Sequence, residues 1–100
     1  MNKFQTVEDI PEIPVVNTVK EHQALCYELI SCGAIPKRNL KVNVTYEGSC
    51  RNADIAKWNG KKFEYVRNKW GESFIDTVPH FEDDMYYDVF IPIKEIPVVQ

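Results

Sequence analysis

The fold of this chain is decided by residues 53–92, which read ADIAKWNGKKFEYVRNKWGESFIDTVPHFEDDMYYDVFIP. Two short turn signals, Asn59-Gly60 and Trp70-Gly71, separate segments that are rich in aromatic residues. Asn-Gly between alternating apolar residues is a strong hairpin signal, because both residues tolerate the positive φ of a type I′ turn. The second half of the chain is therefore predicted to form an antiparallel β-meander.

The residues that precede these turns alternate between apolar and polar, as in strands with one face in water. A first strand is predicted over residues 40–46, a turn over 47–49 and a second strand over 50–58. The alternation of the second strand changes phase after Ile55, which is what a β-bulge produces. We therefore expect a bulge in this second strand.

Three further segments complete the predicted sheet. A strand follows Gly60, and another follows Gly71, each with alternating apolar positions. Residues 80–86 are predicted to be a polar, acidic connection, because they contain three carboxylates. A last strand is expected over residues 87–91, and Pro92 is expected to end it, because proline lacks the N–H that a strand donates.

A helix is predicted over residues 17–33, before the sheet. Thr18 and Glu21 fit a capping box, in which the hydroxyl accepts from one backbone N–H and the carboxylate accepts from another. Gly33 supplies the stop, because glycine adopts the left-handed conformation without steric cost, and Pro36 prevents the helix from resuming. The helix is amphipathic, so its apolar side is expected to pack on the sheet.

These elements predict a single α+β domain. One N-terminal helix would pack on a four- to five-stranded antiparallel meander. The short turns and the suspected bulge also favour an SH3-like, partly open barrel. The predicted parts are an extended arm with prolines (1–16), the helix (17–33), the sheet (40–92) and an extended tail (93–100).

The composition is that of an ordinary globular protein, with 44% apolar and 27% charged residues in a chain of 100. No apolar segment approaches the roughly 20 residues needed to cross a bilayer, so no membrane association is expected. The first residues lack the apolar core of a signal peptide, and a cytoplasmic location is therefore predicted. Cys26, Cys32 and Cys50 have no paired spacing, which favours buried thiols in a reducing compartment.

The charges are segregated along the chain. Residues 37–69 carry a net charge of +6, and residues 70–88 carry −6. In the basic block, Arg51, Lys57 and Arg67 alternate with aromatic residues, a combination that binds single-stranded nucleic acid in some small barrels. The pI near 5.3 opposes such affinity, so nucleic-acid binding is kept as a less favoured alternative.

Two groups of residues are candidates for enzyme chemistry. The acidic segment with His80, Asp83 and Asp84 offers ligands for a divalent metal, and a metal-dependent hydrolase centred there is one alternative function. Its spacing matches no calcium loop. His22 and Cys26 stand four residues apart on the predicted helix and could share a metal, but no zinc spacing accompanies them. No cofactor is expected, and no catalytic motif is present.

The leading hypothesis is a small non-enzymatic binding or adaptor module. It would engage a protein partner through a sheet edge or through exposed aromatic residues, with Trp70, Tyr86 and Tyr87 as anchors, since large rings dominate interface energetics. The sequence Glu-Ile-Pro-Val-Val occurs at residues 12–16 and again at 95–99. The two copies suggest two tails that each cover a sheet edge. Alternatively, both fit one kind of groove on a second copy of the chain in a dimer.

Overall fold

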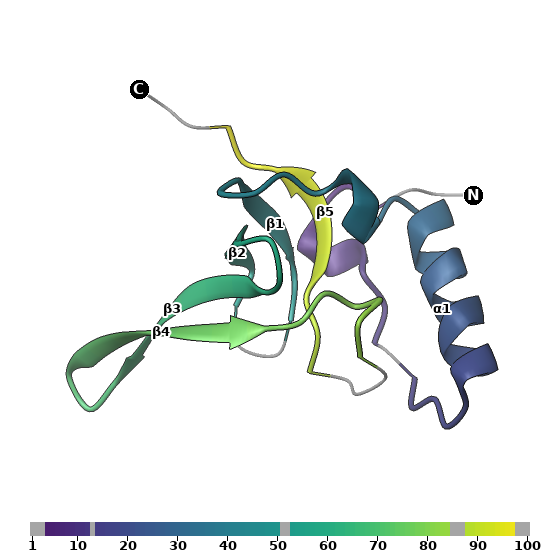
Figure 1. The fold of residues 1–100 in the computed structure, drawn as a ribbon, viewed down its shortest axis with the longest axis horizontal. Coiled ribbons are helices and arrows are strands. Elements are labelled where there is room, and N and C mark those ends of the chain that lie inside the picture. Colours follow the sequence, from purple (N-terminus) through teal and green to yellow (C-terminus); the bar gives the residue numbers. More distant parts are fainter. Residues whose placement is uncertain (1–3, 13, 51–52, 85–87, 98–100) are drawn as a thin grey trace.

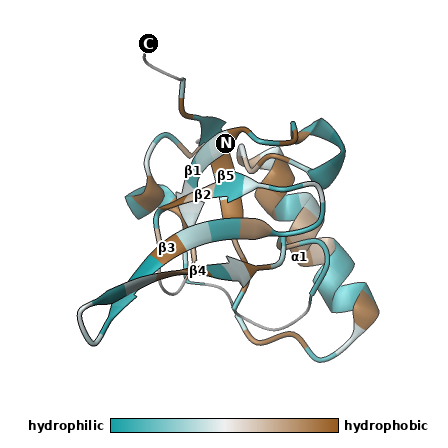
Figure 2. Ribbon diagram, turned by 60° about the vertical axis from the view of Figure 1, so that its left-hand side comes forward, coloured by the Kyte–Doolittle hydropathy of each residue, from teal (hydrophilic) through white to brown (hydrophobic). Residues whose placement is uncertain are grey.

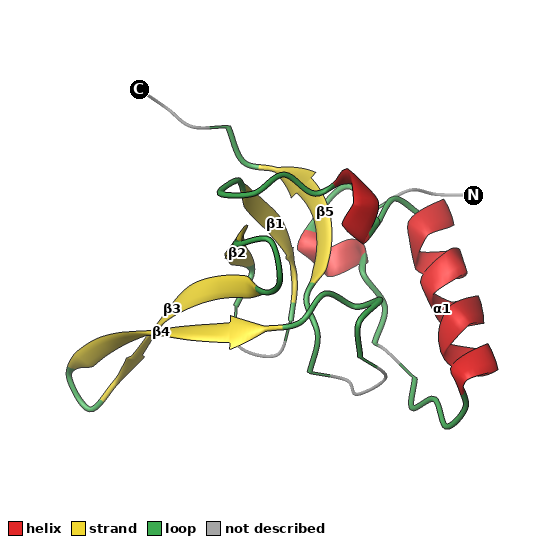
Figure 3. Cartoon of the chain, in the orientation of Figure 1, coloured by secondary structure: helices red, strands yellow, loops and turns green. Residues whose placement is uncertain are grey.

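The structure, a computed structural model, describes residues 4–12, 14–50, 53–84 and 88–97. The described residues form one α-helix, two short 3₁₀ helices (Val7–Asp9 and Lys37–Asn39) and a five-stranded antiparallel sheet (Figures 1 and 3). The predicted α+β class is thereby confirmed. The elements are α1 (Val19–Ser31), β1 (Thr45–Ser49), β2 (Ile55–Trp58), β3 (Phe63–Lys69), β4 (Glu72–Val78) and β5 (Ile91–Glu95).

Helix α1 begins and ends as predicted. The Glu21 backbone N–H donates to Thr18 Oγ1 at 3.1 Å, which is the predicted hydroxyl half of the cap. The Glu21 carboxylate accepts from the N–H of Asn17 at 3.1 Å, one residue before the Thr18 N–H that a capping box uses. Gly33 follows the helix with a φ of 118°, which glycine adopts without strain. Among the described residues, no helix has the length and apolar character that crossing a membrane requires.

The apolar side of α1 packs beside the sheet and not across its face. Cys26 and Leu29 are buried against Phe81 and Val89, which belong to the connection between β4 and β5. This connection lies between α1 and the strands in Figure 1. The helix therefore packs mainly on this connection, with Ile91 of β5 in the same buried cluster, and the sequence pattern did not predict the intervening segment.

The strand order is β4-β3-β2-β1-β5. The first four strands form the predicted meander, and β5 crosses over to pair with β1. The sheet is not closed into a barrel, because β4 and β5 lie at opposite ends of this order. The open sheet thus has two edges, one on β4 and one on β5.

The first two strands begin later than predicted. Strand β1 covers Thr45–Ser49, so residues 47–49 are paired strand and do not form the predicted turn. Strand β2 begins at Ile55, and its side chains alternate regularly between exposed and buried. The predicted bulge in this strand was wrong, and the irregularity occurs instead between Glu47 and Gly48, where β1 pairs with β5.

Gly48 lies at this irregularity, in which Ile93 of β5 is the extra residue without a partner in β1. A side chain at this position would meet the carbonyl oxygen of Ile91 and the ring of Phe90, so only glycine permits this approach of β5. Gly48 pairs with Pro92, which lies inside β5, and the prediction that Pro92 ends the last strand was therefore wrong. Proline is tolerated here because β5 is an edge strand.

The Asn59-Gly60 hairpin forms as predicted, but by a different turn. Gly60 has a φ of 100°, whereas Asn59 does not take a positive φ. Asn59 instead accepts with its side-chain oxygen from the N–H groups of Lys61 and Lys62, both at 2.8 Å. The asparagine therefore caps the turn from its first position.

The two copies of Glu-Ile-Pro-Val-Val have different settings. Residues 14–16 lie in the connection that precedes α1, whereas residues 95–96 continue the pairing of β5 with β1. The predicted tail from residue 93 is therefore partly strand. Ile13 and residues 98–99 lie outside the part of the chain that the structure describes.

Candidate functional site

The β3–β4 hairpin extends beyond the core of the domain (Figures 1 and 2). Phe63, Tyr65 and Val78 are buried at its base, whereas Val66 and every described residue from there to Ile75 are exposed. The pairing of β2 with β3 stops at Glu64, so the outer part of the hairpin is a two-stranded ribbon. An isolated two-stranded ribbon is marginally stable in water.

Both faces of this ribbon carry apolar side chains. On one face, Val66 lies directly opposite Ile75, and these side chains are 63% and 62% exposed. On the other face, Phe74 lies opposite Arg67 and is 41% exposed. Directly opposed apolar side chains stabilise a strand pair by about 0.2–1 kcal/mol, but here they remain largely in water. The ribbon therefore exposes apolar surface on two sides.

Asp76 holds the base of the ribbon in place. Its carboxylate accepts from Arg67 at 3.3 Å, from the Tyr65 hydroxyl at 3.4 Å and from the Thr77 backbone N–H at 2.9 Å. The Thr77 N–H, together with the Arg67 and Tyr65 donors, holds the pKa of Asp76 below its usual value, because hydrogen bonds favour the charged form. Arg67, predicted as a binding residue, is thus engaged within the hairpin.

Trp70 occupies the tip of the ribbon in an unfavourable conformation. Trp70 and Gly71 have φ values of 58° and 77°, so the tip is a type I′ turn. A left-handed backbone costs a residue other than glycine about 1–2 kcal/mol, and asparagine or glycine is usual at this position. The Trp70 side chain is 90% exposed, so packing within the chain does not offset this cost.

The remaining predicted binding residues are not gathered at one place. Lys57 is exposed and lies opposite Glu64, on the face of the sheet away from Arg67. Arg51, Tyr86 and Tyr87 lie outside the described residues. The aromatic residues that alternate with the basic ones are largely core residues, namely Trp58, Phe63 and Tyr65, so their rings do not form a surface on which bases could stack.

The prediction that His80 belongs to a polar loop was wrong. His80 is a core residue. Its Nε2–H donates to the Ile35 carbonyl at 2.9 Å, and its Nδ1 accepts from the Glu82 N–H at 3.1 Å. This pattern requires the neutral ring, because a carbonyl oxygen accepts only and a backbone N–H donates only. Burial lowers the pKa of His80, although the bond to Ile35 and the nearby Glu82 carboxylate oppose the shift.

The predicted metal ligands do not converge. Asp83 forms an ion pair with Lys37 at 3.0 Å, while both ring nitrogens of His80 are engaged in the core. The described residues, Asp84 among them, include no group of three or more His, Cys, Asp or Glu side chains that could hold a metal ion. The geometry around His80 is that of a structural histidine.

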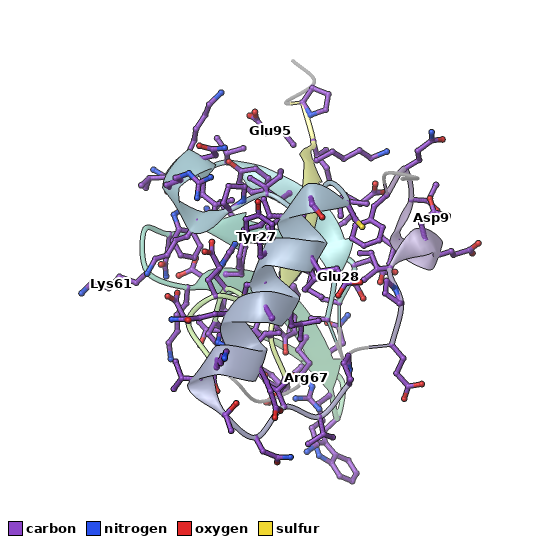
Figure 4. The ribbon with its side chains drawn as sticks, turned by 90° about the vertical axis from the view of Figure 1, so that its right-hand side faces the viewer. Asp9, Tyr27, Glu28, Lys61, Arg67 and Glu95 are labelled. Atoms are coloured by element: carbon purple, nitrogen blue, oxygen red, sulfur yellow. The ribbon has the colours of Figure 1, made fainter. Side chains whose placement is uncertain are left out.

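A hollow of about 260 Å³ lies beside α1, and Figure 4 shows the adjoining side of the helix with Tyr27. Within it, His22 Nε2 lies 2.9 Å from the Phe81 carbonyl and 3.4 Å from Cys26 Sγ. Since Nε2 must carry a proton to bond to the carbonyl, it cannot accept one from the thiol. Desolvation, helped by Glu82, raises the pKa of Cys26 to about 11, so this pair lacks the thiolate that nucleophilic catalysis needs. The hollow is lined by His22, Gln23, Cys26, Tyr27, Ile30, Arg38 and Glu82.

Trp70 is exposed as predicted, whereas the exposure of Val66, Phe74 and Ile75 was not predicted. One signal was available, because Phe74 and Ile75 are adjacent and therefore place apolar side chains on both faces of one strand. No family model, curated protein or solved structure matches the chain.

Proposed function

We propose that this chain is a small non-enzymatic binding module that engages a protein partner through the β3–β4 hairpin. The observation that carries the proposal is Trp70, which holds a strained left-handed turn position with its side chain 90% exposed. Local strain that stability does not require is typical of functional sites. Tryptophan is also the residue type most enriched among the side chains that dominate binding energy.

The ribbon behind Trp70 supports the same function. Val66 and Ile75 form an apolar pair on one face, and Phe74 lies on the other. Contiguous exposed apolar surface on a soluble domain marks an interaction site more often than isolated apolar residues do. A partner that covers the ribbon would also supply the burial that two strands alone lack.

We further infer that the sheet is a partly open, SH3-like arrangement. The bulge between Glu47 and Gly48 supports this inference, because bulges bend strands and increase their twist. The placement of β5 beside β1 brings the last strand next to the first. In such an arrangement the β3–β4 hairpin is free to serve as a binding arm.

Trp70→Asn tests the proposal. Asparagine tolerates the left-handed conformation, so the free energy of unfolding should rise by up to about 1 kcal/mol. Partner binding should be lost at the same time, because the anchor is removed. The matched control is Tyr27→Asn, which removes an aromatic side chain that is 79% exposed on α1.

Binding can be followed without knowing the partner. A photo-activated cross-linking residue is placed at Lys69, beside the tip, in cells that make the protein. The proposal predicts a discrete protein adduct that persists with Tyr27→Asn and disappears with Trp70→Asn. An adduct of equal yield in both variants would contradict a docking role for the hairpin. The absence of any adduct when Trp70 and Tyr27 are both retained would contradict it as well.

A further inference from the structure

Strand β4 has one side that no described strand covers. Because Trp70 and Gly71 form a two-residue turn, Lys69 and Glu72 are a hydrogen-bonded pair. From this pair toward the base of the hairpin, hydrogen-bonded and non-hydrogen-bonded pairs of residues alternate. The residues of β4 whose N–H and C=O groups point away from β3 are Ser73, Ile75 and Thr77. The Thr77 N–H is already bound to the Asp76 carboxylate at 2.9 Å. The open positions are therefore centred on Ile75.

The two edges of the sheet differ in how they are protected. Strand β5 carries a proline, Pro92, and a lysine, Lys94, pairs irregularly with β1, and accepts from the Ile35 N–H at 2.8 Å. These are the devices by which natural sheets block the addition of further strands. Strand β4 contains no proline or lysine and keeps a regular register with β3 over all seven of its residues. The β4 edge is thus the less protected one, with only Glu72, Asp76 and the bound Thr77 N–H to oppose a further strand.

We propose that this edge accepts a strand from a partner protein, one in which basic and apolar residues alternate. The proposal rests on the proposed function and specifies how the hairpin binds. Main-chain hydrogen bonds to Ser73 and Ile75 would give affinity, and the side chains would select the strand. A β-branched apolar residue opposite Ile75 would extend the apolar face that Ile75 shares with Val66.

Charge complementarity favours a basic residue at the alternate positions. Glu72 and Asp76 lie on the same face of β4, with Phe74 between them, and β4 carries no Lys or Arg. Arg67 of β3 already forms an ion pair with Asp76 at 3.3 Å, so Glu72 is the more available of the two carboxylates. A lysine or arginine opposite Phe74 would be diagonal to both carboxylates, a distance that long side chains can span. It would also lie beside an aromatic ring that is already partly exposed.

The same charges disfavour a second copy of this chain. If two β4 strands paired antiparallel about Ile75, Glu72 of each copy would lie diagonal to Asp76 of the other. Like charges across a strand pair destabilise it, and the two-fold symmetry would repeat the repulsion. A strand of different sequence and opposite charge avoids this repulsion.

Three synthetic peptides of seven residues, the length of β4, test the inference. The first alternates lysine and valine, the second alternates glutamate and valine, and the third is the lysine–valine peptide with alternate amides N-methylated. The readouts are the fluorescence of Trp70, measured in a background in which Trp58 is replaced by Phe, and the amide exchange of Ile75. Measurements are made at about 0.15 M ionic strength, where non-specific attraction is screened.

We expect the lysine–valine peptide to bind and to slow the exchange of the Ile75 amide at least tenfold. The glutamate–valine and N-methylated peptides should bind at least tenfold more weakly. Ile75→Pro should weaken binding to the same extent, because it removes an outward N–H without removing a bond to β3. Ile75→Thr, which keeps that N–H, should weaken binding less than Ile75→Pro does.

Equal binding of the N-methylated peptide would overturn strand addition, since that peptide has the charge but not the hydrogen bonds. Protection of Ile75 that rises with protein concentration alone would show that a second copy is the occupant, which also overturns the inference. If no peptide binds while the cross-linked adduct still depends on Trp70, the strand-addition mode is wrong and the docking hairpin stands. If no peptide binds and the cross-linked adduct does not depend on Trp70, the proposed function is wrong as well.

Discussion

Gly48→Ala tests whether β5 lies against β1, the contact that distinguishes this fold from a simple meander. A Cβ at Gly48 would meet the Ile91 carbonyl oxygen and lie 2.7 Å from Phe90 Cε1 and 2.8 Å from the Ile91 carbonyl carbon. Two of these three atoms belong to the backbone and cannot rotate away. Over-packing costs about 1–3 kcal/mol, and a rigid neighbour places this case near about 3 kcal/mol or above.

Gly71→Ala is the matched control. Nothing lies within 4 Å of a Cβ at Gly71, so its cost is only the strain of a φ of 77°, about 1–2 kcal/mol. For a domain of this size, each kcal/mol corresponds to a shift in Tm of about 4–8 °C. Gly48→Ala should therefore lower Tm by at least about 12–24 °C, and Gly71→Ala by about 4–16 °C.

Urea unfolding followed by circular dichroism measures both free energies. Unchanged denaturant slopes would show that the two variants unfold from comparably compact states. A Gly48→Ala variant no less stable than Gly71→Ala would refute the reasoning, because β5 could not then approach β1 at Gly48. The pairing of β5 with β1 would then be wrong.

The remaining predictions concern two buried titratable groups. Because the pKa of folded His80 is below its ordinary value of 6.5, the unfolded chain binds a proton that the folded chain does not, and the free energy of unfolding should fall as the pH drops below about 6.5. His80→Gln should remove this component of the pH dependence and His22→Gln should keep it, as urea unfolding at several pH values would show; identical profiles for the two variants would contradict the assignment. Cys26, with its pKa raised by burial from 9.0 to about 11, should react with iodoacetamide at pH 8 at least about 100-fold more slowly in the folded chain than in denaturant, and mass spectrometry of the labelled peptide would reveal any faster reaction.

Local signals in the sequence predicted the elements whose cause is local. Thr18, Glu21 and Gly33 define α1 almost to the residue, because caps act within one turn. The glycines at positions 60 and 71 likewise mark both hairpins. These residues determine structure through their own backbone conformations and side-chain oxygens.

The features that the sequence did not predict depend on contacts between distant segments. Gly48 resembles a turn glycine, and only the approach of β5 shows that it belongs inside a strand. His80 resembles a loop residue because carboxylates follow it, although its two bonds place it in the core. Pro92 resembles a strand end, but an edge position makes it acceptable within β5.

The candidate site was predicted only in part, for a related reason. Trp70 could be identified because it occupies a turn tip. The exposure of Val66, Phe74 and Ile75 was not predicted, since apolar residues in a strand are ordinarily assigned to the core, and only the adjacency of Phe74 and Ile75 indicated otherwise. These side chains are exposed because β3 and β4 have seven residues each, whereas β2 has only four and is too short to cover the ribbon.

Residue-resolved amide exchange of the dilute, unbound protein tests the central claim most directly. If β4 is an open edge, the Phe74 and Asp76 amides, which point toward β3, should exchange at least tenfold more slowly than the Ser73 and Ile75 amides. Equal protection of Ile75 and Asp76 would mean that something already covers this edge, and the account of an exposed binding hairpin would be wrong.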